Sequence, residues 1–376
     1  MTNLKKVRAA GLAYVAAISV ASIASEAARA ADAFDLGAMI EAARQEPPIT
    51  VYAVTGKIVD TAQAFTKKYG VQASGKKVNE ATQVELLIRE RQAGNVVGDV
   101  SVATDVASAM GELLPEGIVT SWTPPDIEAD IPEKLRNPLT VVSDAHVWTY
   151  NTEKYAKCPV TNIWQLTEPQ WKGKLAMLDL FDKPLYADWF NQIEMHHDAE
   201  VAKAYEDLYG KKLDTGGATA TAAWVKAFAE NGPLLSDSTT VADAAGAPGQ
   251  ADPFFVITST AKYRDNEAKG LKLGLCAGIK PFSGFLYPGF GLIATQTKSP
   301  NAARLFVHYL MTEEGIAPQT VDGKISGNSK INLPLDEPSG VSRHIDELMA
   351  FDSSTAAADL DKRESWQDFW RTNYRK

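Results

Sequence analysis

The chain has 376 residues, of which 38 are lysine or arginine and 47 are aspartate or glutamate, so its formal net charge at pH 7 is −9. Nucleic acids and anionic membrane surfaces attract positive charge, and this balance therefore argues against either of them as the main partner. The length is ample for two domains, and the composition is that of an ordinary globular protein.

The first 30 residues have the pattern of a secretory signal peptide. Lys5, Lys6 and Arg8 form a positive start, residues 9–24 are apolar, and Ala28-Arg29-Ala30 matches the small-residue pattern for cleavage after Ala30. The apolar run is short for a membrane span, which disfavours the alternative of an uncleaved anchor. We therefore expect an exported, soluble mature protein, which is more acidic than the full chain because four basic residues and one acidic residue leave with the signal.

Cys158 and Cys276 are the only two cysteines of the chain. In an exported protein an even pair favours a disulfide, and two separate buried thiols are the alternative. Two cysteines are too few for a structural zinc site of the usual four-ligand kind.

Strands and helices are expected to alternate between residues 49 and 105. The segment 49–54 is rich in β-branched and aromatic residues, and apolar residues then recur at helical spacing up to a break at Gly70. The expected elements are a strand at 49–54, a helix at 58–69, an extended segment from 71, a helix from 81 to about 93 and a strand at 99–105. Such alternation predicts a parallel sheet, and ligands lie beyond the carboxyl ends of its strands.

The remaining chain is divided by two long extended runs, at 140–150 and 283–294, which we interpret as crossings between two domains. Between them we expect helices at 185–195, 201–209 and 221–231 and strands at 233–236, 252–259 and 271–275. An amphipathic helix follows at 302–311. A final helix places Trp366, Phe369 and Trp370 on one face, and we expect these aromatic residues to dock the tail onto the first domain.

Four passages together resemble the substrate-binding proteins of bacterial ABC importers with the type II periplasmic fold. The resemblance is to the branch that contains ferric-ion, thiamine, phosphonate, polyamine and sugar-phosphate receptors. The passages are Ile49-Thr-Val-Tyr-Ala-Val-Thr-Gly56, Trp148-Thr-Tyr-Asn-Thr152, the Trp-Lys-Gly-Lys segment with its flanks at 164–175, and the segment 299–315. They span nearly the whole mature chain.

The resemblance implies an α/β fold with two lobes, two hinge crossings at 141–150 and 287–294, and a ligand clamped between the lobes. After the signal peptide at 1–30, it implies a first lobe at 31–145 plus 291–376 and a second lobe at 146–290. It also implies a periplasmic monomer without a cofactor, whose partners are a small-molecule ligand and an inner-membrane ABC permease. Ligand binding in such proteins is a hinge closure.

Several small polar residues stand where expected strands hand over to helices. Unpaired N–H groups and the helix dipole favour negative groups at helix starts, although plain N-capping explains the same residues. The two-lobe arrangement would bring them to the face between the lobes. The residues expected to face a ligand for this reason are Thr55, Gly56, Thr82, Asp105, Ser236, Ser238 and Ser259.

A further set of candidates opens a helix of the second domain. Lys183 could meet an anionic ligand group, and Tyr186 and Trp189 could line the cleft, with a place in the core as the alternative for both aromatic residues. His197 and Asp198, after His196, could bind a metal or hydrogen-bond a polyhydroxylated ligand. Adjacent residues at a helix end rarely face one metal, however, and a solvated helix end is the simpler interpretation.

Tyr287 lies in the returning crossing and could stack on a ligand or hydrogen-bond to it. Iron receptors of the family carry two adjacent tyrosines in this half, whereas Tyr287 is flanked by Leu286 and Pro288. This departure weakens an iron-binding interpretation, and we predict no metal site.

No HExxH, P-loop or GxSxG motif is present, and no nucleophile stands beside a base. We therefore predict a non-catalytic periplasmic receptor of an ABC importer for a small polar solute, anionic or phosphorylated. A ferric-ion receptor is the alternative within the class, and an exported α/β hydrolase or transferase is the alternative outside it.

Overall fold

The computed structural model describes residues 34–375, so the predicted signal peptide lies outside the described residues. The strands are β1 Ile49–Ala53, β2 Ala73–Lys77, β3 Val100–Ala103, β4 Val119–Ser121, β5 Thr140–Asn151, β6 Leu175–Leu178, β7 Leu234–Ser236, β8 Phe255–Ser259, β9 Leu273–Leu275, β10 Gly284–Ala294, β11 Ile325–Ser326 and β12 Leu348–Ala350. The helices are α2 Leu36–Ala43, α3 Lys57–Tyr69, α4 Glu80–Ala93, α5 Val106–Ser108, α6 Leu185–His196, α7 Asp198–Tyr209, α8 Ala220–Glu230, α9 Ser238–Gly246, α10 Asp265–Ala268, α11 Pro300–Leu310, α12 Glu313–Thr320 and α13 Ala356–Asn373.

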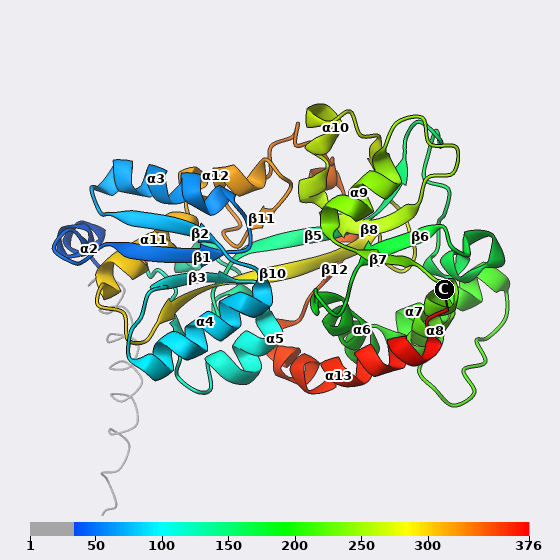
Figure 1. Ribbon diagram of the computed structural model, residues 1–376, viewed down its shortest axis with the longest axis horizontal. Coiled ribbons are helices and arrows are strands. Elements are labelled where there is room, and N and C mark those ends of the chain that lie inside the picture. The colour runs from blue at the N-terminus through cyan, green and yellow to red at the C-terminus, as the bar shows by residue number, and fades with distance from the viewer. Residues whose placement is uncertain (1–33, 376) are drawn as a thin grey trace, which may run out of the picture.

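One mixed sheet runs through the molecule in the order β2-β1-β3-β10-β5-β8-β6-β7 (Figure 1). The outer pairs β1–β2, β1–β3, β6–β7 and β6–β8 are parallel, as the alternation of strands and helices predicts. The two long strands β5 and β10 lie in the centre and pair antiparallel, from Gly284 opposite Val147 to Phe290 opposite Thr140. The predicted crossings are therefore the strands at which the two sides of the sheet meet.

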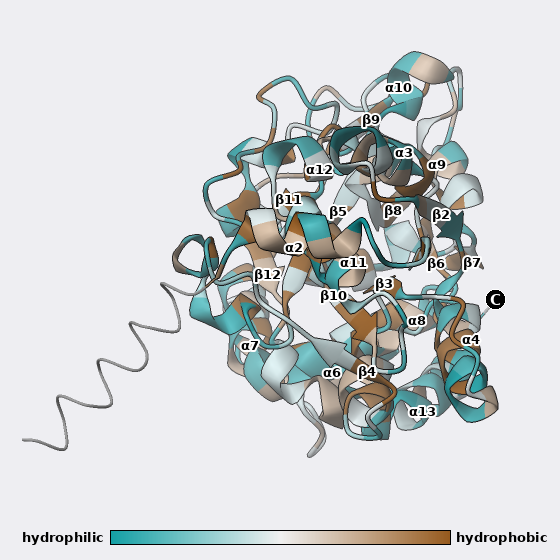
Figure 2. Ribbon diagram, turned by 90° about the vertical axis from the view of Figure 1, so that its left-hand side faces the viewer, coloured by the Kyte–Doolittle hydropathy of each residue, from teal (hydrophilic) through white to brown (hydrophobic). Residues whose placement is uncertain are grey.

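We call the β1–β3 side, with α2–α5, α11 and α12, the first lobe, and the β6–β8 side, with α6–α10, the second lobe. In the first lobe α3 and α11 pack together, and the ring centroids of Phe65 and Phe306 lie 4.9 Å apart. In the second lobe Trp148 stacks on Phe255 at 5.8 Å. Figure 2 shows the hydrophobic residues gathered on inner strands such as β3, with α12 and α13 mostly hydrophilic outside. The two-lobed α/β architecture is confirmed, while the residue bounds given above for the lobes stay a prediction.

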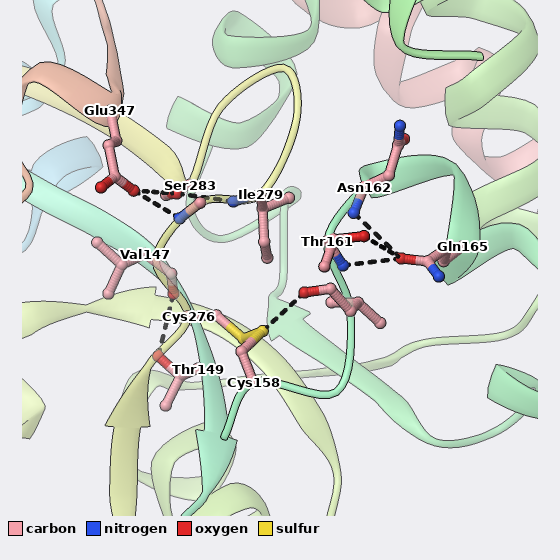
Figure 3. Close-up of a disulfide and its surroundings, with 12 residues drawn as sticks. Val147, Thr149, Cys158, Thr161, Asn162, Gln165, Cys276, Ile279, Ser283 and Glu347 are labelled. Atoms are coloured by element: carbon pink, nitrogen blue, oxygen red, sulfur yellow. Dashed lines mark hydrogen bonds between the residues drawn. A yellow bond between two sulfur atoms is a disulfide. The ribbon is translucent and has the colours of Figure 1, made fainter. Parts of the chain in front are cut away.

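The two cysteines form a disulfide, which settles the alternative left open by the sequence. Cys158 follows β5, Cys276 follows β9, and the bond joins residues 118 positions apart with their Cα atoms separated by 5.1 Å (Figure 3). Both cysteines lie in the second lobe, so the bond restrains that lobe and does not tie it to the first.

The C-terminal helix α13 packs chiefly on the second lobe. Trp370 stacks on Phe190 of α6 with centroids 5.8 Å apart and also touches Phe228 of α8, while Trp366 packs against Phe190. The prediction that these aromatic residues dock the tail onto the first domain is therefore wrong. Helical spacing identifies the buried face of a helix but carries no information on which partner covers it.

Candidate functional site

A cavity of about 210 Å³ lies between the two lobes, above the strands at which they meet. It is lined from the first lobe by the β1–α3 loop, the end of β2 and the start of α4, and from the second lobe by the ends of β6 and β8 and by the start of α9. The lining residues are Val54, Thr55, Gly56, Lys77, Glu80, Asp144, His146, Leu178, Lys183, Leu185, Ser238, Ser259, Ala261, Lys262, Arg264, Asp322 and Lys324.

The β1–α3 loop presents the start of a helix to the cavity. The hydroxyl of Thr55 accepts a hydrogen bond from the Lys57 N–H at 3.3 Å, and Gly56, the N-cap residue of α3, supplies no capping side chain. A Cβ atom built at Gly56 would meet nothing within 4 Å, so the backbone here is open to a close approach. The N–H groups of the first turn are bonded to oxygen atoms of Thr55 and Gly56. The positive end of the dipole of this 13-residue helix still favours a negatively charged ligand group here.

Asp144 and His146 form the floor of the cavity because residues two apart on β5 point to the same side of the sheet. Asp144 pairs with Lys324 at 3.2 Å and accepts a hydrogen bond from the Ser259 hydroxyl at 2.8 Å. Burial opposes ionisation of Asp144, but the positive charge of Lys324 and the bond from Ser259 outweigh it and hold the pKa of this carboxyl below its usual value. Asp144 is therefore a carboxylate whose charge is already balanced.

His146 is buried and neutral. Its Nδ1 lies 3.0 Å from the Tyr186 hydroxyl, and its ring stacks on Phe285 with centroids 5.1 Å apart. Burial disfavours the imidazolium and lowers the pKa of His146 to about 4, even though Asp144 opposes this shift. The ring adds a polar but uncharged group to the floor.

Two ion pairs cross from one lobe to the other along the cavity. Lys183 of the second lobe lies 3.5 Å from Glu80 at the start of α4, and Arg264 lies 2.6 Å from Asp322, which follows α12. Burial raises the pKa of Glu80, although Lys183 acts in the opposite direction. These pairs link the lobes at the cavity, and each neutralises one positive and one negative charge of its lining.

Even so, the lining carries an excess of positive charge. Lysine and arginine contribute five lining residues against three carboxylates, which gives a formal charge of +2 in a chain whose total is −9. A positive cavity in an acidic protein attracts anions locally while the surface as a whole does not.

Of the residues predicted from the sequence, Thr55, Gly56, Lys183, Ser238 and Ser259 line this cavity. Thr82 and Ser236 do not. Asn79 is the residue that caps α4, and its side chain accepts from the N–H of Thr82 at 2.9 Å, so Thr82 lies within the first turn.

The three aromatic candidates lie in the protein core. Tyr186 donates to the Ile257 carbonyl at 3.2 Å, Trp189 stacks on Phe285 at 4.8 Å, and Tyr287 donates to Asp188 at 3.0 Å. All three are less than 5 % exposed. Tyr186 still bears on the cavity, because it holds the ring of His146.

Asp105 caps α5 and lies away from the cavity. Its carboxylate accepts from Ser108 and from Arg363 of α13, and the same guanidinium group holds Asp188 of α6 at 2.8 Å. Asp105 is thus part of a buried ion-pair cluster between the lobes.

His197 and Asp198 also lie outside the cavity. His197 and His196 border a second depression of about 540 Å³ together with residues 133–135, 137 and 350–354. Asp198 caps the start of α8 by accepting from the N–H and hydroxyl of Thr221, both at 2.7 Å. Within residues 34–375, no three histidine, cysteine or carboxylate side chains gather in a way that could hold a metal.

Most of the charged residues of the cavity were not predicted from the sequence. They are Lys77, Glu80, Asp144, His146, Lys262, Arg264, Asp322 and Lys324. A usable signal existed for two of them, since Asp144 and His146 are polar residues at strand spacing within an otherwise apolar run. Asp322 and Lys324 come from a loop about 180 residues further along, and nothing local to that loop indicates the pairing. In the described part of the chain, no helix combines the length and hydrophobicity needed to cross a bilayer.

A model of the family described as bacterial extracellular solute-binding protein matches residues 49–323. No curated protein matches the chain in sequence. Among solved structures, iron-bound HitA from Pseudomonas aeruginosa is 15 % identical with a TM-score of 0.63, covering 86 % of this chain and 98 % of its own. AfuA from Actinobacillus pleuropneumoniae, with fructose-6-phosphate bound, is 17 % identical with a TM-score of 0.62, covering 87 % and 98 %.

These structural likenesses extend over nearly the whole length of the solved chains and show the predicted type II periplasmic-binding-protein fold. The family model extends from the start of β1 to beyond the end of α12 and includes both crossings. The chain therefore belongs to the family of bacterial extracellular solute-binding proteins, which are receptors for small-molecule ligands.

Proposed function

We propose that the protein captures a small organic anion, carboxylated or phosphorylated, between its lobes in the periplasm and delivers it to the permease of an ABC importer. The observation that carries this proposal is the excess of positive charge in the cavity, five basic side chains against three carboxylates in an acidic chain.

Size and polarity support the same ligand class. A cavity of about 210 Å³ is smaller than the roughly 300–1,000 Å³ of sites for drug-sized ligands. Thr55, Ser238 and Ser259 add hydroxyl groups, and the backbone at Gly56 is open to a close approach by the ligand. Such a lining fits a compact ligand with several oxygen atoms and a negative charge.

A thermal-shift panel tests the proposal with small organic acids, phosphate esters, neutral sugars, amines and a ferric salt. A ligand that binds only the folded state stabilises that state, by about 2.7 kcal/mol when its concentration is a hundred times Kd. Anions that bind should therefore raise Tm by several degrees. Neutral sugars and amines should not. A shift produced by amines or by the ferric salt alone would contradict the proposal, as would conversion of any bound compound into a product.

A further inference from the structure

The charges that line the cavity divide into a paired and an unpaired set. Lys183, Arg264 and Lys324 each have a carboxylate partner within the lining, at 3.5, 2.6 and 3.2 Å. Within residues 34–375, Lys77 and Lys262 form no ion pair with any carboxylate. The whole positive excess of the cavity therefore resides on these two lysines.

The two unpaired lysines lie on opposite walls. Lys77 is the last residue of β2 in the first lobe, next to Val78, whose N–H is bonded to the Ala53 carbonyl just before the β1–α3 loop. Lys262 ends a short helical turn after β8 in the second lobe, and its ammonium group donates to Thr239 of α9 at 2.9 Å. A ligand that contacts both ammonium groups must touch both lobes.

The environment of Lys262 makes an anionic partner favourable. Burial lowers the pKa of Lys262, since water is partly excluded from its ammonium group. Lys77 remains exposed at the cavity edge. Two positive groups that face one cavity repel each other weakly, and this repulsion opposes closure of the lobes. An anion placed between the two groups removes the repulsion and so favours the closed state.

We propose that Lys77 and Lys262 select ligands with a doubly charged phosphate monoester group, which they hold from opposite lobes beside the start of α3. This inference rests on the proposed function and names the ligand class and the selecting residues. A phosphate monoester carries about −1.5 to −2 charge at pH 7 and three acceptor oxygens, which match two ammonium groups and the positive end of the α3 dipole at Gly56. A carboxylate or a sulfate monoester carries a single charge and leaves one lysine uncompensated.

Calorimetric titration with matched esters tests the proposal on the full mature protein. The probes are glucose 6-phosphate against glucose 6-sulfate, and ethyl phosphate against ethyl sulfate, because each pair differs in charge and hardly in shape. The wild-type protein should bind at least one phosphate ester about ten-fold or more tightly than its sulfate counterpart. Lys77→Gln and Lys262→Gln should each weaken phosphate-ester binding by about ten- to a hundred-fold, the usual loss for a charge-assisted hydrogen bond, and should reduce the preference.

Lys76→Gln is the matched control. Lys76 is exposed, precedes Lys77 on the same strand and does not line the cavity, so this variant should keep the wild-type affinity and preference. Equal affinity for both members of each pair, or an unchanged preference in both test variants, would overturn the inference and leave the proposed function standing. Tighter binding of succinate than of either phosphate ester would do the same. Failure of every organic anion in the panel to bind would contradict the proposed function itself.

Discussion

His146 is the residue of the cavity whose protonation depends most clearly on burial. The folded protein keeps this imidazole neutral, with its pKa lowered to about 4 by burial, whereas a histidine in the unfolded chain titrates near 6.5. Between these values the unfolded state binds more protons than the folded state. The free energy of unfolding must therefore fall as the pH falls through this window.

Replacement of His146 by Asn should remove this dependence, because an amide keeps a polar partner for Tyr186 and does not titrate. On lowering the pH from 7.5 to 5, the wild-type protein should lose about 2 kcal/mol more unfolding free energy than His146→Asn. Urea denaturation at the two pH values measures the difference. Equal losses of unfolding free energy in both proteins would contradict this, because they would mean that His146 takes up its proton equally in the folded and unfolded states.

Thr55 and Thr82 offer a second test at the level of single residues. Thr55 lines the cavity, and Thr82 lies outside it. Because the hydroxyl oxygen of Thr55 accepts a hydrogen bond from the N–H of Lys57, the hydroxyl proton of Thr55 is available to a ligand. Thr55→Val should weaken binding of an anionic ligand by about two- to ten-fold, the cost of one neutral hydrogen bond, with little change in Tm. Thr82→Val should leave the affinity as it is. Titration of both variants with the same ligand decides the point, and equal losses would contradict the placement.

Among the elements, the segment 49–105 was predicted almost to the residue, because its strands and helices carry strong periodic patterns and glycine stops. α3 ends at Tyr69 before Gly70, and α4 ends at Ala93 before Gly94, both glycines with positive φ. The two crossings were likewise visible as long runs of strand-forming residues. The environment of each aromatic side chain could not be predicted in this way, since the sequence pattern around Tyr186 and Tyr287 is the same whether they line a cavity or lie in the core.

α13 carries an arginine, Arg363, whose ion pairs with both lobes could not be predicted from any local sequence pattern. Arg363 binds Asp188 of the second lobe through two nitrogen–oxygen contacts of 2.9 and 2.8 Å and Asp105 of the first lobe at 2.7 and 3.2 Å. Even with this guanidinium beside it, burial raises the pKa of Asp188 to about 6. The helix thus joins the two lobes through one arginine placed between two buried carboxylates.

Arg363→Met should therefore destabilise the protein by about 3–5 kcal/mol, because it leaves buried carboxylates without a partner. Arg371→Met on the same helix is the control. Its partner Asp368 is exposed and its guanidinium carbon lies 4.3 Å from the centroid of the Phe181 ring, so the loss should stay within about 1 kcal/mol. Chemical denaturation of both variants measures the difference. Adding Asp188→Asn to Arg363→Met should recover part of the stability, and equal effects of the two arginine changes would contradict this role of α13.

At the scale of the whole molecule, the two lobes meet over a positive cavity that neither lobe forms alone. The first lobe contributes the start of α3 and Glu80, the second contributes Lys183 and Arg264, and the crossing β5 supplies the floor. Because two of the three ion pairs of the lining span the lobes, closing and opening must exchange these contacts for contacts with water or ligand. The site is thus built to respond to a ligand that touches both sides.

Native mass spectrometry of the mature protein, after incubation with a small-molecule extract and removal of free solutes, tests the central claim most directly. We predict one retained small organic anion per chain, released on denaturation and chemically unchanged. A retained neutral or cationic solute, or a ligand recovered as a reaction product, would contradict the account.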